Sequence, residues 1–197
     1  VAQGYDAEFH HCSSDNNSLD GVVIPKLGVA FIDGTAPHIV DPKHPGCMDE
    51  ILKLGGYWNE KGIVAHKSNI IDCTAEISKN YQRAYRLLKA AKLIYDDFAA
   101  INTEALDITK ANQVAHELIS RIFDDPSKIG SGKIRKLFAS AITPDGPVNH
   151  LDSCVWCVGK CHVINGDPGT GKSTIVQKVI NTAVTMGLNV EVYYCPL

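Results

Sequence analysis

The sequence lacks the features that would place the chain in a membrane. No apolar run approaches the roughly 20 residues that span a bilayer. No charged segment followed by an apolar one opens the chain, as it does in a secretory signal peptide. We therefore expect no membrane partner and a cytoplasmic location.

A surplus of positive charge and a cysteine framework are also missing. The chain has 19 Lys and Arg against 22 Asp and Glu, so nucleic acid is not indicated as a partner. Seven cysteines is an odd number, and their spacing suggests no set of disulfides, which favours a reducing compartment. What remains is ordinary for a globular protein: 45% of the 197 residues are hydrophobic and 21% are charged, enough for one large domain or two.

The most specific motif lies near the end of the chain. It matches G-x-x-x-x-G-K-[ST] in full and consists of Gly166, Asp167, Pro168, Gly169, Thr170, Gly171, Lys172, Ser173 and Thr174. The apolar run at residues 162–164 predicts a strand before it, and the periodic pattern at residues 175–186 predicts a helix after it. A strand, a glycine-rich loop and a helix, in that order, are the context of a phosphate-binding loop (P-loop).

The chemistry expected of this motif is nucleotide binding. Its glycines let backbone N–H groups turn toward a phosphate chain, and the helix N-terminus adds the positive end of its dipole. Lys172 is expected to reach the β- and γ-phosphates and Ser173 to ligate Mg²⁺. The predicted cofactors are therefore ATP and Mg²⁺. ATP is favoured over GTP because the sequence has no Asn-Lys-x-Asp motif, although that motif's absence leaves GTP open.

A second candidate for the metal site is Asp33. It ends the apolar run at residues 27–33, which has the form of a Walker B strand and predicts a parallel strand buried on both faces. A carboxylate there would lie where open α/β sheets bind ligands and would hold Mg²⁺ through water or Ser173. The alternative is that Asp33 starts a turn with Gly34. We name Lys172 and Asp33 as the catalytic candidates.

Other catalytic groups are weaker candidates. His38 and Thr143 are each either a sensor of the γ-phosphate or an ordinary loop or turn residue. Arg135 is a candidate for the arginine that stabilises charge on the phosphates during hydrolysis, and the alternative is a surface role. No convincing catalytic glutamate is visible.

The middle of the chain predicts a helical insert at residues 47–127. A short helix is expected at residues 48–54, a long amphipathic helix at about 66–101 and a third helix at 108–123. The long helix carries a group of basic residues that form either a solvated face or a contact for a partner or an anion: Lys79, Arg83, Arg86, Lys89 and Lys92.

A cysteine cluster precedes the P-loop. Cys154, Cys157 and Cys161, together with His162, could supply four metal ligands. Against this, Cys161 and His162 would point to opposite faces of the predicted strand. A second, distant ligand pair is also missing, so metal binding here stays open.

The two ends of the chain resemble each other. Four positions are identical when the ends are aligned, namely Val1, Gly4, Glu8 and Cys12 with Val184, Gly187, Glu191 and Cys195. Because the second copy follows a P-loop helix, the first is expected to do so as well. We therefore expect a fragment or processed product of a tandem protein. Such a protein would have two P-loop modules in one chain. Residues 1–46 would hold the Walker B-like strand of the first module. Residues 128–197 would hold the remaining strand of the first module, followed by the P-loop, helix and next strand of the second.

Residues 11–25, residues 31–38 and the P-loop together resemble a poorly characterised family of bacterial P-loop ATPases with two such modules in one chain. The resemblance implies an α/β fold, a three-layer P-loop NTPase-like sheet with an inserted helical subdomain, and ATP binding with hydrolysis. The missing first P-loop and the cysteine cluster depart from the family pattern.

The function expected from the sequence is Mg²⁺-dependent ATP binding, with hydrolysis coupled to a conformational change. The alternatives are a small-molecule or nucleoside kinase and a non-hydrolysing, nucleotide-gated interaction module. Expected partners are the nucleotide and either a second P-loop module or another copy of the chain.

Overall fold

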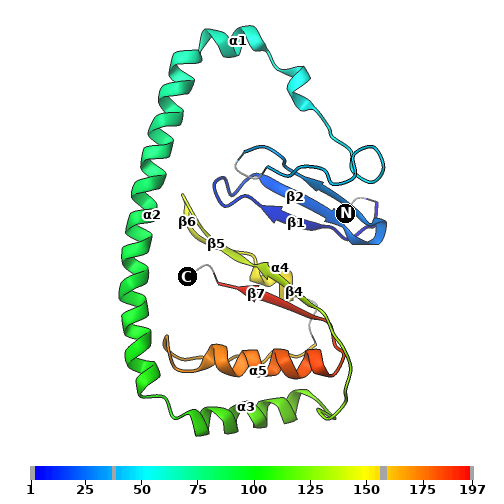
Figure 1. Cartoon of the computed structure of the whole chain (residues 1–197), viewed down its shortest axis with the longest axis vertical. Helices are drawn as coiled ribbons and strands as arrows, with labels where there is room; N and C mark the ends of the chain where they lie inside the picture. Colours follow the sequence, from blue (N-terminus) through cyan, green and yellow to red (C-terminus); the bar gives the residue numbers. More distant parts are fainter. Residues whose placement is uncertain (1–2, 37–38, 156–158, 196–197) are drawn as a thin grey trace. The chain divides into compact units, whose positions relative to one another are not determined.

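The computed structural model describes residues 3–36, 39–155 and 159–195. These residues divide into two compact units, whose helices and strands are labelled in Figure 1. Unit 1 comprises Val1–Glu76 with Ala141–Val148, and unit 2 comprises Ile77–Ser140 with Asn149–Leu197. Among the described residues, no helix combines the length and the apolarity that crossing a bilayer requires.

Unit 1 is built on a three-stranded antiparallel sheet in the order β1-β2-β3. The strands are β1 (Glu8–His11), β2 (Leu19–Ile24) and β3 (Val29–Ile32). The short 3-10 turn η1 (Pro25–Leu27) joins β2 to β3, and Gly28 closes it with a φ of 64°. A turn this short can connect only antiparallel neighbours, since parallel strands need a long crossover.

The remaining elements of unit 1 are small. After β3 the chain forms the 3-10 turn η2 (Leu54–Tyr57) and the helix α1 (Glu60–Ala65). The strands β5 (Ser140–Thr143) and β6 (Gly146–Asn149) pair as a two-stranded sheet that lies largely in this unit.

Two sequence-based predictions are wrong in this unit. Residues 27–33 were expected to form a buried parallel strand, but β3 is an antiparallel edge strand whose residues are all exposed. The helix expected at residues 48–54 is replaced by turns and then η2. Hydrogen bonds with His44 hold residues 47–49 in a turn instead, and Gly55 and Gly56 directly after the segment disfavour a helix there.

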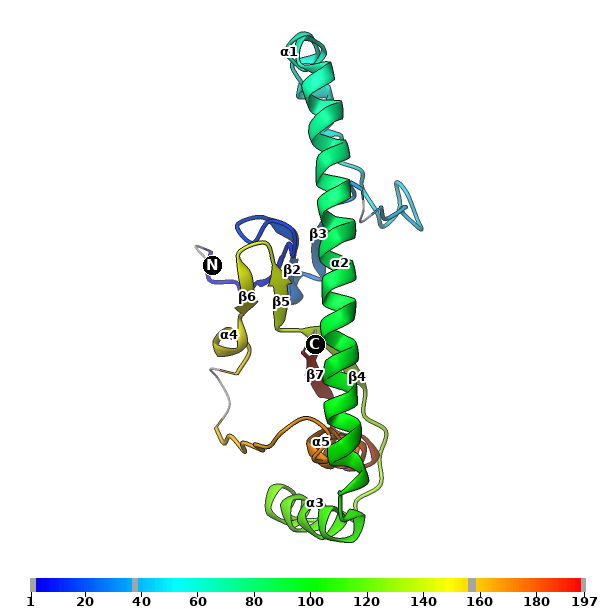
Figure 2. The same ribbon diagram turned by 90° about the vertical axis from the view of Figure 1, so that its left-hand side faces the viewer.

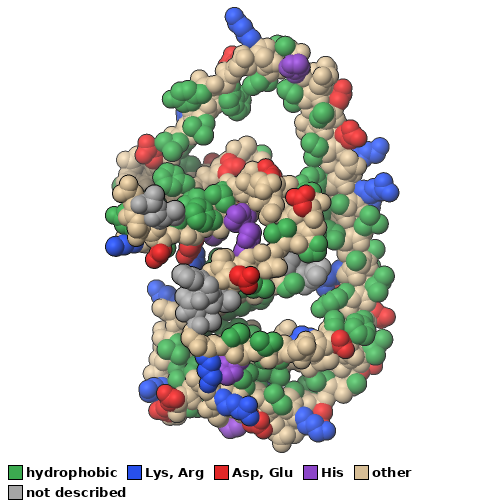
Figure 3. All heavy atoms as spheres, turned by 180° about the vertical axis from the view of Figure 1, so that it is seen from behind, with side chains coloured by type: hydrophobic (Ala, Val, Ile, Leu, Met, Phe, Trp, Pro, Cys, Tyr) green, Lys and Arg blue, Asp and Glu red, His purple; other side chains and the backbone are tan. Residues whose placement is uncertain are grey.

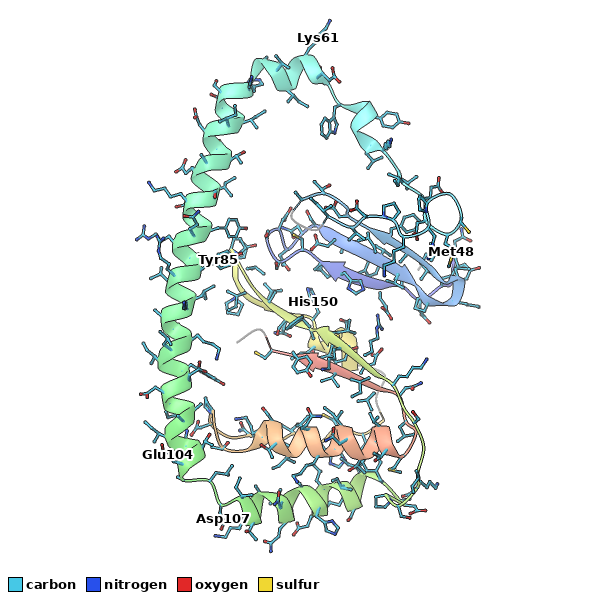
Figure 4. All side chains as sticks on the ribbon, in the orientation of Figure 1. Met48, Lys61, Tyr85, Glu104, Asp107 and His150 are labelled. Carbon is cyan, nitrogen blue, oxygen red and sulfur yellow. The ribbon has the colours of Figure 1, made fainter. Side chains whose placement is uncertain are left out.

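Unit 2 contains the long helices. The long helix expected near residues 66–101 is confirmed as α2 (Lys67–Glu104), whose first ten residues belong to unit 1, and it is unbroken (Figure 2). The expected third helix is confirmed as α3 (Ile108–Ile122), capped by the Asp107 side chain, which accepts from the Lys110 N–H. Glu104 and Asp107 bracket the turn between α2 and α3 (Figure 4).

Among its described residues, the rest of unit 2 consists of two helices and a pair of strands. The helix α4 (Leu151–Val155) is short, and α5 (Lys172–Thr185) confirms the helix expected after the P-loop. The strands β4 (Ile134–Phe138) and β7 (Val190–Tyr194) form a parallel pair. Two strands do not make the three-layer sheet expected from the sequence, so that fold stays a prediction.

The core of unit 2 lies where α5 packs against α3. Its buried side chains are small or medium in size: Ala111, Ala115, Ile175, Ile180 and Ala183. By contrast α2 buries none of its residues, and hydrophobic side chains such as Ile94 remain exposed along it (Figure 3). The alanines of α3 are what allow α5 to approach closely.

The two proposed repeat segments both form strands but pair differently. β1 pairs antiparallel with β2, whereas β7 pairs parallel with β4. Agreement in secondary structure alone does not establish a repeat, which therefore stays a prediction.

Candidate phosphate-binding loop

The loop at residues 166–174, called the phosphate loop below, turns into α5 through glycine. Gly171 is the N-cap residue of α5 with a φ of 88°, and Gly169 has a φ of 79°. Both values lie in the left-handed region, which side chains other than glycine rarely adopt. The Ile175 N–H donates to the Gly171 carbonyl at 3.0 Å, so the first helical hydrogen bond closes directly behind the loop.

The Lys172 side chain folds back over the loop. Its ammonium Nζ donates to the carbonyl oxygens of Gly166 at 2.5 Å and Asp167 at 2.6 Å. An ammonium group has three donors, so one remains for another acceptor. A cation thus lies within the loop, next to the positive end of the α5 dipole.

The loop also has internal hydrogen bonds that fix its shape. The Thr170 hydroxyl donates to the Asp167 carbonyl at 2.7 Å. The Gly166 N–H donates to the side chain of Asn165 at 2.9 Å. Ser173 and Thr174, in the first turn of α5, are exposed to solvent.

Residues of α2 that the sequence analysis did not single out hold the loop from outside. The Asn102 side-chain amide donates to the Pro168 carbonyl at 2.8 Å. The Thr103 hydroxyl lies 3.3 Å from the Gly169 carbonyl oxygen. No local signal in the sequence points to these contacts, because 66 positions separate each pair.

The strand expected before the loop is absent. Residues 161–167 have no regular secondary structure and pair with no strand of the described chain, and Val163 is 86% exposed. An apolar run becomes a strand only where a neighbour supplies the ladder of hydrogen bonds. The prediction of a strand at residues 162–164 is therefore wrong, although the helix after the loop is confirmed.

Asp33 forms a local turn. Its carboxylate Oδ1 accepts from the Thr35 N–H at 2.8 Å, and its own N–H donates to the Asp20 carbonyl at 2.8 Å. This geometry fits the alternative that Asp33 starts a turn. Asp33 belongs to unit 1 and Lys172 to unit 2, so a shared site for the two stays a prediction.

The weaker candidates have structural partners where they are described. The Thr143 hydroxyl donates to the Gly146 carbonyl at 2.8 Å and closes the β5–β6 turn. Arg135 forms an ion pair with Glu191 at 3.0 Å across the β4–β7 pair. His38 lies outside the described residues.

Glu191 also binds a tyrosine. The Tyr193 hydroxyl donates to the Glu191 carboxylate at 2.8 Å, and this hydrogen bond raises the pKa of the Tyr193 phenol, with burial and the nearby negative charge adding to the shift. Arg135, Glu191 and Tyr193 therefore form a cross-strand polar group that stabilises the parallel pair, which favours a surface role for Arg135.

The cysteine cluster does not form a metal site in the part that is described. Cys154 and Cys161 are free thiols, and Cys157 lies outside the described residues. Within residues 3–36, 39–155 and 159–195, no group of three or more His, Cys, Asp or Glu side chains is arranged to hold a metal ion.

Comparison with known proteins adds no relative. No family model, no curated protein and no solved structure matches the chain. The resemblance to tandem P-loop ATPases therefore stays a prediction. The functional argument depends on the geometry of the phosphate loop.

Proposed function

We propose that the phosphate loop binds the phosphate chain of ATP together with Mg²⁺. The observation that carries the proposal is the position of the Lys172 ammonium, which donates to two carbonyls of its own loop. This arrangement holds a positive charge at the start of α5 with one donor left for a phosphate oxygen.

The neighbouring groups suit the same ligand. The first N–H groups of a helix have no partner within the helix, so those at the start of α5 are suited to bind phosphate oxygens. The exposed Ser173 hydroxyl suits Mg²⁺, which keeps several waters and takes its other oxygens largely from phosphates. Bound Mg²⁺ would neutralise phosphate charge, while the residues of the chain hold and orient the nucleotide.

We further propose hydrolysis of ATP, with Lys172 and Asp33 as its catalytic residues, coupled to a conformational change. A second candidate function is a nucleotide-gated interaction module without turnover. The contacts of Asn102 and Thr103 with the phosphate loop favour it, because they connect the nucleotide site to a long helix with exposed apolar residues.

The binding proposal is tested by calorimetric titration of MgATP into the whole chain and into Lys172→Ala. Loss of a hydrogen bond to a charged group costs about 1.5–3 kcal/mol, so we expect affinity to fall about 10- to 150-fold. Lys178→Ala, in the same helix, is the matched control and should bind as the unchanged chain does. Failure of the unchanged chain to bind MgATP, or equal binding by Lys172→Ala, contradicts the proposal.

Turnover distinguishes the functions that share this site. Release of inorganic phosphate, lost in Lys172→Ala and reduced in Asp33→Asn, would support hydrolysis. Phosphate transfer to an added nucleoside would support a kinase instead. Binding without either product would favour the gated module.

A further inference from the structure

We propose that the C-terminal turn of α2 is a positioning element for the phosphate loop. Asn102 and Thr103 would hold two loop carbonyls and thereby fix the backbone of the loop with the Gly169 N–H directed toward the phosphates. This inference rests on the proposed nucleotide binding and identifies the residues that shape the site.

The contacts lie on consecutive peptide groups of the loop. The Asn102 amide donates to the Pro168 carbonyl at 2.8 Å, in a partly buried setting, and the Thr103 hydroxyl lies 3.3 Å from the Gly169 carbonyl. The same hydroxyl lies 2.8 Å from the Ala99 carbonyl. Because a hydroxyl has one proton to donate, the two carbonyls share it, and Thr103 is the weaker of the two anchors. Two adjacent side chains of one helix turn therefore hold two adjacent peptide groups.

Peptide geometry converts this anchoring into orientation. In a trans peptide the C=O and the following N–H point in opposite directions. Holding the Pro168 carbonyl against Asn102 therefore directs the Gly169 N–H away from α2. The Thr170 N–H, which follows the Gly169 carbonyl, donates to the Asp167 carbonyl at 3.4 Å and so helps to close the turn of the loop. The Gly169 N–H is an amide of the kind that a phosphate loop presents to its ligand.

The close approach depends on glycine. A Cβ on Gly169 would collide with the Ala99 carbonyl oxygen, and a Cβ on Gly171 would come within 3.2 Å of Leu106. The α2 turn and the segment that follows it therefore lie directly against the loop. Because all these residues belong to unit 2, the contacts are internal to one compact unit.

The test measures the affinity of MgATP and of magnesium pyrophosphate for the whole chain and for Asn102→Asp and Thr103→Val. Asn102→Asp replaces the donor with an acceptor, and we expect about tenfold weaker binding; Thr103→Val should weaken it about threefold. A positioning role on the phosphates predicts the same factor for both ligands. Asn80→Asp and Thr74→Val are the matched controls on α2, expected to stay within about twofold, since the Thr74 hydroxyl binds only the Ile70 carbonyl in its own helix.

Rescue separates positioning from loss of structure. Thr103→Ser restores the hydroxyl and should return the affinity to within about twofold of the unchanged chain. The proposal is overturned if Thr103→Ser binds as weakly as Thr103→Val, or if Asn102→Asp binds as the unchanged chain does.

Hydrogen exchange measured without ligand distinguishes failure of the proposed nucleotide binding from failure of the proposed anchoring by α2. In Asn102→Asp the amides of residues 166–171 should exchange faster than in the unchanged chain, because the loop has lost an anchor. If the unchanged chain binds no nucleotide, the proposed function fails, while faster exchange in the variant still supports the anchoring. Unchanged exchange in the variant overturns the anchoring whatever the chain binds.

Discussion

Glycine at position 169 is required by two separate constraints. Its φ of 79° disfavours any side chain, and the Ala99 carbonyl occupies the space where a Cβ would lie. The G-x-x-x-x-G-K-[ST] pattern leaves this position free, so the motif does not explain the glycine. The contact with α2 does.

Gly169→Ala should therefore weaken nucleotide binding more than an ordinary glycine substitution. We expect the loop to move away from α2, since a strained left-handed alanine alone costs about 1–2 kcal/mol before the collision is counted. MgATP titration measures the effect, which should be at least tenfold. Gly56→Ala is the control, because its φ is not positive and its Cβ would meet nothing within 4 Å. Equal affinities in the two variants would show that the close approach does not matter.

At the level of elements, unit 2 depends on a narrow interface between α3 and α5. Ala111 and Ala115 on α3 lie against an α5 whose own buried residues include Ile180. Because few large side chains are buried, each contributes a large share of the stability of the unit.

Ile180→Ala should lower the free energy of unfolding of unit 2 by about 2 kcal/mol, at the lower end of the range for buried isoleucine. The value is low because Ile180 is 9% exposed, and the small interface can partly relax around it. Urea unfolding followed by circular dichroism measures the change. Ile94→Ala is the control, since Ile94 is 75% exposed on α2. A loss as large in the control would contradict the assignment of the core.

The start of α3 depends on an ionised cap. The Asp107 carboxylate accepts a hydrogen bond from the backbone N–H of Lys110 and another from the Lys110 side chain. These two hydrogen bonds, the backbone one more than the other, hold the pKa of Asp107 below its usual 3.8. Since the folded-state pKa is the lower one, the stabilisation is present above the unfolded value and is lost as pH falls through the folded value.

We therefore expect the first turn of α3 to lose protection as pH drops below about 4, measured by hydrogen exchange of residues 108–112. Asp107→Asn keeps a capping side chain but removes the titration, so its α3 protection should vary less with pH. Equal pH dependence in both chains would show that another group controls the helix start.

At the scale of the whole molecule, the candidate residues belong to different units. The phosphate loop and its α2 anchors lie in unit 2, whereas Asp33 lies in unit 1. Binding by the loop alone should stabilise unit 2, whereas a site shared with Asp33 should stabilise both.

MgATP at 100 times its dissociation constant should stabilise the unit that binds it by about 2.7 kcal/mol. We expect the added protection in hydrogen exchange at residues 99–115 and 166–185, and at residues 8–33 as well if Asp33 takes part in the site. Lys172→Ala should show no gain in either set. Absence of added protection at residues 166–185 would contradict binding by the phosphate loop, and absence at residues 8–33 alone would contradict the proposed role of Asp33.

Features encoded in consecutive residues could be predicted from the sequence. α2, α3 and α5 follow from helical periodicity, and the left-handed N-cap at Gly171 follows from its place in the motif. The error at β3 has a physical cause: an apolar run is compatible with a buried or an exposed strand, and the connection to its neighbour decides between them.

The sequence by itself determined the phosphate loop, because the glycines, Lys172 and the start of α5 lie in one short stretch and interact locally. Only the tertiary structure decided what surrounds that loop. The strand expected at residues 162–164 needed a partner, and the described residues supply none. The contacts of Asn102 and Thr103 join positions 66 residues apart. Sheet pairing and loop anchoring depend on which distant segments meet, and local sequence patterns do not specify that.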